Sequence, residues 1–148
     1  MQDKVINTMK LEFTARSVNE SLARSAVSAF AAQADPSIAV IADIKTVVSE
    51  AVTNSIVHGY AGVEDKSLCP IYIHCKFYES SRLVVRLKDR GCGIEDICMA
   101  MQPLFTTDSD GERSGMGFTI MQTFTDGFKV RSEPGKGTTV VLEQRLKR

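Results

Sequence analysis

The chain has 148 residues, in which 18 Lys and Arg balance 18 Asp and Glu, so its formal net charge is zero. This length predicts a single domain, residues 1–148, whose core needs no metal or disulfide for stability. The zero net charge gives no global attraction to nucleic acid or to an anionic membrane, which excludes neither a local charged site nor a protein partner.

The sequence contains no apolar run of signal-peptide length at its start and none near the roughly 20 residues of a membrane span. We therefore expect a cytoplasmic protein. Without any C-x-x-C pair, we interpret its cysteines as reduced thiols that serve as small apolar residues. They are Cys69, Cys75, Cys92 and Cys98.

The first elements in chain order are an edge strand over 5–14 and a helix that runs to about residue 34. Ser17 and Glu20 fit a capping box at the start of this helix. Its apolar stripe is predicted to consist of Leu22, Ala26 and Phe30. With that stripe against the core, Arg24 is expected to face solvent.

A second helix is predicted over 39–58, after the break at Asp35 and Pro36, and Gly59 ends it. Its wide apolar face predicts deep burial. The residues of that face are Ile44, Val47, Val48, Ala51, Val52 and Ile56.

The second half of the chain is predicted to contain most of the sheet. Alternation predicts a hairpin of 71–79 and 82–89, and two more strands over 127–133 and 137–146. Between these pairs we expect short helices over 95–101 and 115–125. Hairpins with helices clustered between them predict an α+β fold, a mostly antiparallel sheet with helices on one face.

Two polar residues of the second helix, Glu50 and Asn54, are four positions apart and share one face. A carboxylate and an amide oxygen stacked in this way can bind Mg²⁺, or the carboxylate can orient a nucleophile beside the metal. A solvated face of an amphipathic helix is the alternative, because such pairs are common.

The segment "DRGCGI" at 89–94 follows a strand directly. Asp89 could accept a hydrogen bond from an exocyclic amine such as that of adenine, and Gly91 and Gly93 would let a flat base approach the backbone. A plain turn is the alternative. The third glycine of a dinucleotide-binding fingerprint is absent, and the chain contains no P-loop motif.

The polar stretch from about 102 to 114 has the length and composition of a movable cover over a ligand. It leads into Gly115 and Gly117 at a helix start, where free backbone N–H groups and the helix dipole favour a phosphate. Arg113 would add a positive charge. The three constellations occur in order in one short chain, which favours a nucleotide site over three coincidences.

At these residues the chain resembles the GHKL ATPase superfamily. "E-x-x-x-N" at 50–54 is similar to its N box, "D-x-G-x-G" at 89–93 to its first glycine box, and "G-x-G" at 115–117 to its second. The segments "LEFTARSVNESLAR", "DIKTVVSEAVTNSIVHGY", "PLFTT" and "ERSGMGFTIM" resemble the anti-sigma factor serine kinases of spore-forming bacteria, specifically their sporulation members. The similarity extends from about residue 10 to 142.

The resemblance implies a Bergerat-type two-layer sandwich that binds ATP or ADP with Mg²⁺ under a lid at about 102–114. It implies Glu50 and Arg113 as catalytic residues, Asn54 as the Mg²⁺ ligand and Arg24 as a partner contact. The remaining residues that it implies for the nucleotide are Asp89, Gly91, Gly93, Thr106, Thr107, Gly115, Met116, Gly117 and Thr138. Alternation alone does not decide whether Thr138 or Thr139 faces the nucleotide.

The function implied is that of a protein serine kinase and anti-sigma factor. Such a protein binds a sporulation sigma factor, phosphorylates a STAS-type anti-anti-sigma protein on serine and acts as a homodimer, without contacting nucleic acid or membrane. Two alternatives remain open at this point: a nucleotide-dependent sigma-binding module with negligible turnover, and the related kinase for a stress-response sigma factor. The sigma factor, the acceptor serine and the dimer interface are not determined by the sequence.

Overall fold

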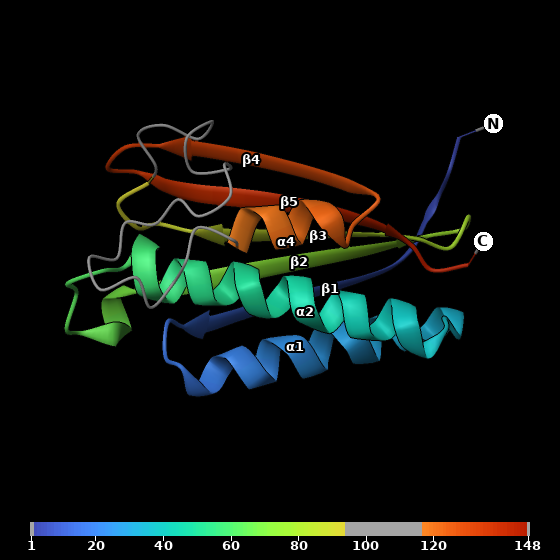
Figure 1. Cartoon of the computed structure of the whole chain (residues 1–148), viewed down its shortest axis with the longest axis horizontal. Coiled ribbons are helices and arrows are strands. Elements are labelled where there is room, and N and C mark those ends of the chain that lie inside the picture. Colours follow the sequence, from blue (N-terminus) through green and yellow to red (C-terminus); the bar gives the residue numbers. More distant parts are fainter. Residues whose placement is uncertain (1, 94–116, 148) are drawn as a thin grey trace.

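The structure, a computed structural model, describes residues 2–93 and 117–147. Its described strands form one five-stranded sheet in the order β1-β2-β3-β5-β4, in which every neighbouring pair is antiparallel (Figure 1). The strands are β1 (Val5–Thr14), β2 (Pro70–Tyr78), β3 (Arg82–Asp89), β4 (Gly127–Glu133) and β5 (Gly137–Arg145). The predicted edge strand, hairpin and C-terminal strands are confirmed.

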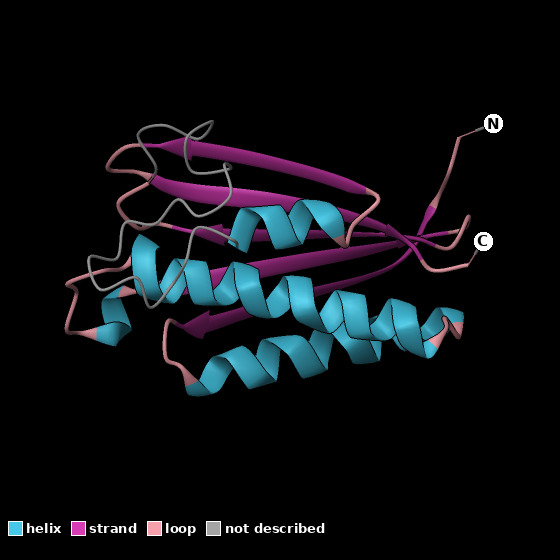
Figure 2. Cartoon of the chain, viewed as in Figure 1, coloured by secondary structure: helices cyan, strands magenta, loops and turns pink. Residues whose placement is uncertain are grey.

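The helices of the described residues all lie over one face of this sheet, and none of them covers the other face, here called the open face (Figures 1 and 2). They are α1 (Val18–Ala31), α2 (Ile38–Asn54) and α4 (Gly117–Thr123), with short 3-10 segments at Ala32–Ala34 and Lys66–Leu68 and a π-helical turn at Ser55–Gly59. The predicted α+β two-layer architecture is therefore confirmed. No helix in the described parts of the chain is long and apolar enough to cross a membrane.

The core lies between the sheet and the helices. Along β2, the predicted alternation is confirmed, because Ile71, Ile73, Cys75 and Phe77 are buried while the residues between them are not. Burying a large apolar side chain contributes roughly 1.5–3 kcal/mol. Burial also raises the pKa of the Cys75 thiol to about 12, so this cysteine behaves as a small apolar residue.

The predicted inner face of α1 is wrong for Leu22, whereas Phe30 is partly buried and packs against the core as predicted. Leu22 is 50% exposed, and the residues that α1 buries are Ala23, Val27, Ser28 and Ala31. Small side chains at the contact let the axis of α1 lie close to its neighbours. A prediction that chooses the buried face by its largest apolar side chains therefore misplaces Leu22. Arg24 is consequently half-buried and pairs with Glu20 at 3.2 Å.

The predicted capping box is also absent. Ser17 already has helical backbone angles, φ −55° and ψ −34°, and its side chain makes no capping hydrogen bond. An N-cap side chain reaches the following N–H groups only from non-helical backbone. Ser37 does so at the start of α2, where its hydroxyl accepts from the N–H of Val40.

The apolar face of α2 is confirmed for Ile44, Val47, Val48, Ala51 and Val52, which are all buried, while Ile56 is partly buried. Ser55 follows in the same angular phase and is also buried. The helix then widens into the π-helical turn, which the sequence did not predict. The predicted helix over 95–101 and the cover at 102–114 lie outside the described residues.

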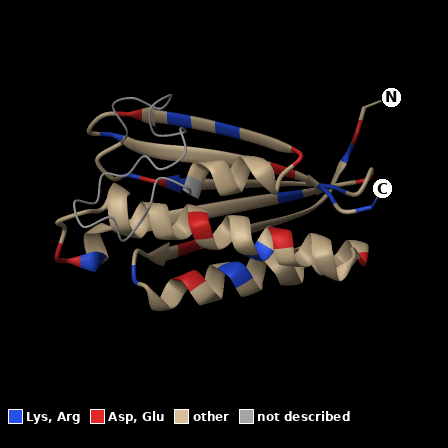
Figure 3. Cartoon of the chain, viewed as in Figure 1, with Lys and Arg blue, Asp and Glu red and all other residues tan. Residues whose placement is uncertain are grey.

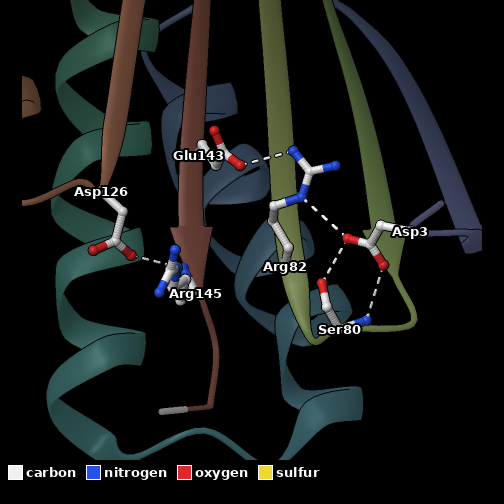
Figure 4. Close-up of polar contacts among 6 residues, drawn as sticks. All are labelled: Asp3, Ser80, Arg82, Asp126, Glu143 and Arg145. Atoms are coloured by element: carbon white, nitrogen blue, oxygen red, sulfur yellow. Dashed lines mark hydrogen bonds and ion pairs between the residues drawn. The ribbon is translucent and has the colours of Figure 1, made fainter. Parts of the chain in front are cut away.

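At the opposite end of the sheet from this turn, the N-terminal segment is bound to the β2–β3 turn and, through Arg82, to β5 (Figure 4). Asp3 accepts hydrogen bonds from Ser80 Oγ at 2.6 Å and from Arg82 Nε at 3.3 Å, and Arg82 also donates to Glu143 at 2.7 Å. The hydrogen bond from Ser80 is the main cause that lowers the pKa of Asp3.

Because the pKa of Asp3 is lowered in the folded state, its stabilising effect is present above its ordinary value of 3.8 and is lost as the pH falls through the folded value. We expect Asp3→Asn to lower the melting temperature near neutral pH, and this difference to vanish in acid, once the pH is below the lowered folded value. Thermal melts of both proteins across this range measure it. In a Ser80→Ala background the pH dependence of the difference should shrink; an unchanged profile there would contradict the assignment.

Candidate functional site

The candidate site lies where α2 and β3 end and β5 begins, at one end of the sandwich (Figure 1). Asp89 is the last residue of β3 and pairs in register with Thr138 of β5. It is 3% exposed and points to the helix-covered face, in the phase of Leu83, Val85 and Leu87. A buried carboxylate at a strand end needs compensating donors, and three are present.

Three donors from three different segments hold the Asp89 carboxylate. Its Oδ2 accepts from Ser55 Oγ at 2.6 Å, and its Oδ1 accepts from the backbone N–H groups of Gly91 at 2.9 Å and Thr138 at 3.2 Å. A carboxylate offers about four acceptor positions, so one position on Oδ2 remains for a ligand. The arrangement leaves the carboxylate able to accept one further hydrogen bond.

Gly59 leaves space next to this carboxylate. A Cβ on Gly59 would lie 3.1 Å from Asp89 Oδ2, closer than side-chain carbons normally approach. Gly59 ends the π-helical turn, and its carbonyl accepts from the N–H of Cys92 at 2.7 Å. Single π-helical turns within α-helices are frequent at functional sites. Here the turn brings Ser55 and Gly59 to the same carboxylate.

The glycine turn after β3 fits between two backbone segments. A Cβ on Gly91 would lie 2.0 Å from the carbonyl oxygen of Gly59, and one on Gly93 would lie 2.2 Å from that of Glu133. Gly93 also has φ +76°, which favours glycine. The N–H of Gly135 donates to the carbonyl of Cys92 at 2.6 Å. The turn therefore joins the end of α2 to the β4–β5 turn.

Tyr60 supports the same end of the sheet beside the glycine turn. Its hydroxyl donates to the carbonyl of Pro70 and accepts from the N–H of Arg90 at 2.7 Å. The residue is 3% exposed, and burial raises the pKa of its hydroxyl. It thus links the start of β2 to the end of β3 as a neutral donor and acceptor.

Glu50 and Asn54 lie on the last turns of α2, both half-buried and next to the buried face of the helix. Asn54 immediately precedes Ser55, which donates to Asp89, so the helix end that carries these two residues also bounds the site. Their carboxylate and amide oxygens are the hard donors that Mg²⁺ prefers, and Mg²⁺ keeps several water or phosphate ligands. The donor set therefore fits Mg²⁺ bound together with phosphates.

Strand register distinguishes the two threonines of β5. Thr138 shares the helix-covered face with Asp89, Val140 and Leu142, whereas Thr139 pairs with Lys88 on the open face. The Thr138 hydroxyl lies 2.9 Å from that of Ser132. Its part in nucleotide binding stays a prediction.

Only some of the other predicted site residues belong to the described parts of the chain. Gly117 is the first residue of α4, while Thr106, Thr107, Arg113, Gly115 and Met116 lie outside the described residues. Arg24 lies in the first half of α1, where its side chain contacts Glu20 and Ser21.

Ser55, Gly59 and Tyr60 were not predicted as site residues. One signal was available for Ser55, because a polar residue stood at a core position of the second helix. Nothing in the sequence indicated that Gly59 approaches Asp89, since 30 positions separate them and the π-helical turn decides the contact.

Three described cysteines differ in accessibility, which gives a direct test of the fold. Cys92 is exposed between the site glycines, whereas Cys69 and Cys75 are buried. We expect an alkylating reagent to modify Cys92 rapidly in the folded protein and to leave Cys69 and Cys75 unmodified, because burial blocks access and, for Cys75, disfavours the thiolate. Peptide mass mapping after a short reaction measures this. Equal labelling at Cys75 and Cys92 in the folded protein would be incompatible with the fold.

The fold and the sequence both match known proteins. The family model described as "Histidine kinase-like ATPase domain" matches residues 13–143. Among solved structures, the RsbU and RsbW domains of a Mycobacterium tuberculosis protein align with a TM-score of 0.68 at 18% identity, over 96% of this chain and 33% of that one. A histidine kinase domain from Erythrobacter litoralis aligns with a TM-score of 0.55, also at 18% identity, over 83% of this chain and 59% of that one. These two likenesses support the fold alone.

Relatives with higher sequence identity indicate the family of the chain more specifically. The anti-sigma F factor of Clostridium novyi is 49% identical over 141 residues, 95% of this chain and 96% of the relative. The anti-sigma F factor of Thermoanaerobacter pseudethanolicus is 55% identical over 134 residues, 90% of each chain. The chain therefore belongs to the histidine kinase-like ATPase domain family, in the branch that these anti-sigma F factors form. Membership of an ATPase domain family implies that it binds nucleotide.

Proposed function

We propose that the chain is an ATP-dependent protein serine kinase that also acts as an anti-sigma factor for a sporulation sigma factor. The structural observation that carries its nucleotide-binding part is the Asp89 carboxylate, held by three donors with one acceptor position left beside Gly59. Family membership and relatives named anti-sigma F factor support it.

In this proposal the exocyclic amine of adenine donates to Asp89 Oδ2, and the absence of side chains at Gly59, Gly91 and Gly93 accommodates the base. Thr138 adds a polar group on the same face. A carboxylate that accepts a hydrogen bond from this amine disfavours guanine and hypoxanthine, which have a carbonyl at the equivalent position. Nucleotide selectivity therefore follows from Asp89.

The phosphates would extend toward the end of α2 and the start of α4. Asn54 would hold Mg²⁺, which neutralises phosphate charge when it is bound. Gly115, Met116 and Gly117 would donate backbone N–H groups, and Arg113 would steady the γ-phosphate, as the family motif implies. Thr106 and Thr107 belong to the proposed lid.

The proposed reaction moves the γ-phosphoryl group of ATP to a serine hydroxyl of an anti-anti-sigma protein and leaves ADP. Glu50 would orient the hydroxyl and accept its proton. Phosphoryl transfer depends on positioning and charge stabilisation more than on covalent participation by the enzyme. One half-buried carboxylate next to the metal ligand is therefore sufficient as the base.

The kinase proposal is tested with radiolabelled ATP, Mg²⁺ and a purified STAS-type anti-anti-sigma protein. We expect label on serine with the wild type, and a loss of about 10²-fold or more with Glu50→Gln, while ATP affinity changes little. Arg113→Ala should also reduce turnover. If the wild type binds ATP and captures sigma but transfers no label, the chain is a nucleotide-dependent binding module and the kinase assignment fails.

Arg24 is proposed to contact the protein partners. Its side chain is 40% exposed and is oriented by Glu20, which limits the entropy that it would lose on binding. We expect Arg24→Ala to weaken capture of purified sigma F in the presence of ATP, without changing ATP affinity. Lys45→Ala, at an exposed position of α2, is the matched control. Equal capture by both variants would remove Arg24 from the interface.

Homodimer formation is part of the same proposal, and sedimentation with ATP and sigma present tests it.

A further inference from the structure

The open face of the sheet has a charge pattern that the proposed function does not use. Side chains directly opposite each other on neighbouring strands share a face, so the register defines rows across the sheet. One row consists of Lys10, His74, Arg86, Val141 and Lys129, on β1, β2, β3, β5 and β4 in turn. The adjacent row consists of Glu12, Tyr72, Lys88, Thr139 and Arg131.

These two rows and Lys76 form what we call the basic face, with the cations Lys10, Lys76, Arg86, Lys88, Lys129 and Arg131. None of these six has an acidic partner among residues 2–93 and 117–147. The nearby acids Glu133 and Glu143 are already paired, with Lys136 and Arg82, and Glu12 in the second row offsets one of the six positive charges. Figure 3 shows Lys and Arg along β4, whereas acidic residues appear with basic ones on α1 and α2.

The pKa of His74 is affected by the cations around it. Burial lowers the pKa of His74, and the positive charges of Lys10, Lys76 and Arg86 lower it further. No two of the six cations are directly opposite each other in the register, so they repel at longer range, along a strand as Arg86 and Lys88 do and diagonally as Lys10 and Lys76 do. The chain is neutral as a whole, so this concentration of positive charge is a local feature of one face. An anionic partner would relieve the repulsion.

We propose that the basic face is a docking surface for an acidic segment of a partner protein. A second copy of the chain is disfavoured, because two basic faces would repel each other. Single-stranded nucleic acid is disfavoured because an arginine already lies over the ring of each of the two tyrosines on this face. Arg90 lies 5.2 Å from the ring centre of Tyr72, and Arg82 lies 4.0 Å from that of Tyr78, whereas base stacking needs a free ring face.

The location of the surface makes it independent of the nucleotide site. The basic face lies on the side of the sheet away from the helices, whereas Asp89 and Thr138 point to the helix-covered side. An acidic segment can therefore bind while nucleotide is bound, and neutralising this face should leave ATP affinity unchanged.

The test uses a fluorescently labelled poly-glutamate peptide and a single-stranded oligothymidine of the same charge, each titrated by anisotropy into the full chain. The variant Lys10→Gln, Arg86→Gln, Lys129→Gln removes three cations of one row. Its matched control is Lys45→Gln, Arg16→Gln, Lys66→Gln, which removes the same charge elsewhere. We expect the row variant to bind poly-glutamate about tenfold more weakly than wild type, and the control to differ less than twofold.

The row variant should also unfold at a higher denaturant concentration than wild type at low ionic strength, because repulsion is reduced, and this shows that it is folded. Equal poly-glutamate affinity in both triple variants would overturn the proposal. Tighter binding of oligothymidine than of poly-glutamate to wild type would overturn it in favour of nucleic acid. A wild-type dimer that the row variant converts to monomer would overturn it in favour of a second copy.

Discussion

Replacing Gly91 with alanine is expected to lower the free energy of unfolding by about 3 kcal/mol, in the upper range for overpacked sites, and to abolish ATP binding. The added Cβ would lie 2.0 Å from the carbonyl oxygen of Gly59 and 2.4 Å from its carbonyl carbon. Both are backbone atoms and cannot rotate away. The glycine turn must therefore move away from the end of α2, which separates the N–H of Gly91 from the Asp89 carboxylate.

Urea denaturation and calorimetric titration with ATP measure the two effects. Gly62→Ala is the matched control, because Gly62 has φ +79° but an added Cβ there would meet no atom within 4 Å. It should cost only the left-handed backbone preference, about 1 kcal/mol, and leave ATP affinity unchanged. A Gly91→Ala protein that is as stable as Gly62→Ala and binds ATP would show that the two backbone segments do not approach this closely.

Replacing Asp89 separates its structural role from its proposed role in recognition. Asp89→Ala leaves the hydroxyl of Ser55 and the N–H groups of Gly91 and Thr138 without their acceptor in a buried place. We expect a loss of about 3 kcal/mol in the free energy of unfolding. Asp89→Asn keeps an oxygen for the two N–H groups and a polar group for Ser55, so its loss should be about 1 kcal/mol.

ATP affinity is expected to behave differently. In Asp89→Asn an amide donor replaces the oxygen that faces the adenine amine, so two donors meet. We expect ATP affinity to fall by about 100-fold, the loss of a hydrogen bond to a charged acceptor, although the protein remains folded. Calorimetric titration with ATP beside urea denaturation checks both quantities. An Asp89→Asn protein with wild-type ATP affinity would remove Asp89 from base recognition.

The sheet and α2 could be predicted because their burial follows local periodicity. In β2 every second residue is buried, and in α2 the apolar positions recur at helical spacing, so residue type alone indicates the face. In α1 the same reasoning fails for Leu22. Its close contacts select Ala23 and Ala31 over the larger Leu22, and the packing distance between helices is not encoded in hydrophobicity.

The candidate site was predictable in its residue types but not in its geometry. Glu50, Asn54 and Asp89 were identified because the core pattern does not explain them. The contacts of Asp89 with Ser55 and Thr138 depend on the π-helical turn and on strand register, which join residues 34 and 49 positions apart. These contacts can therefore be identified only from the folded structure.

Selection of the adenine amine by Asp89 is central to the proposed nucleotide site. The most direct measurement is a calorimetric titration of the wild-type chain with ATP and with ITP, which carries a carbonyl where ATP carries the amine, in the presence of Mg²⁺. We predict that ATP binds and that ITP binds at least about tenfold more weakly, because its carbonyl faces the carboxylate oxygen. Equal affinity for the two nucleotides, or no binding of ATP, would contradict this role of Asp89.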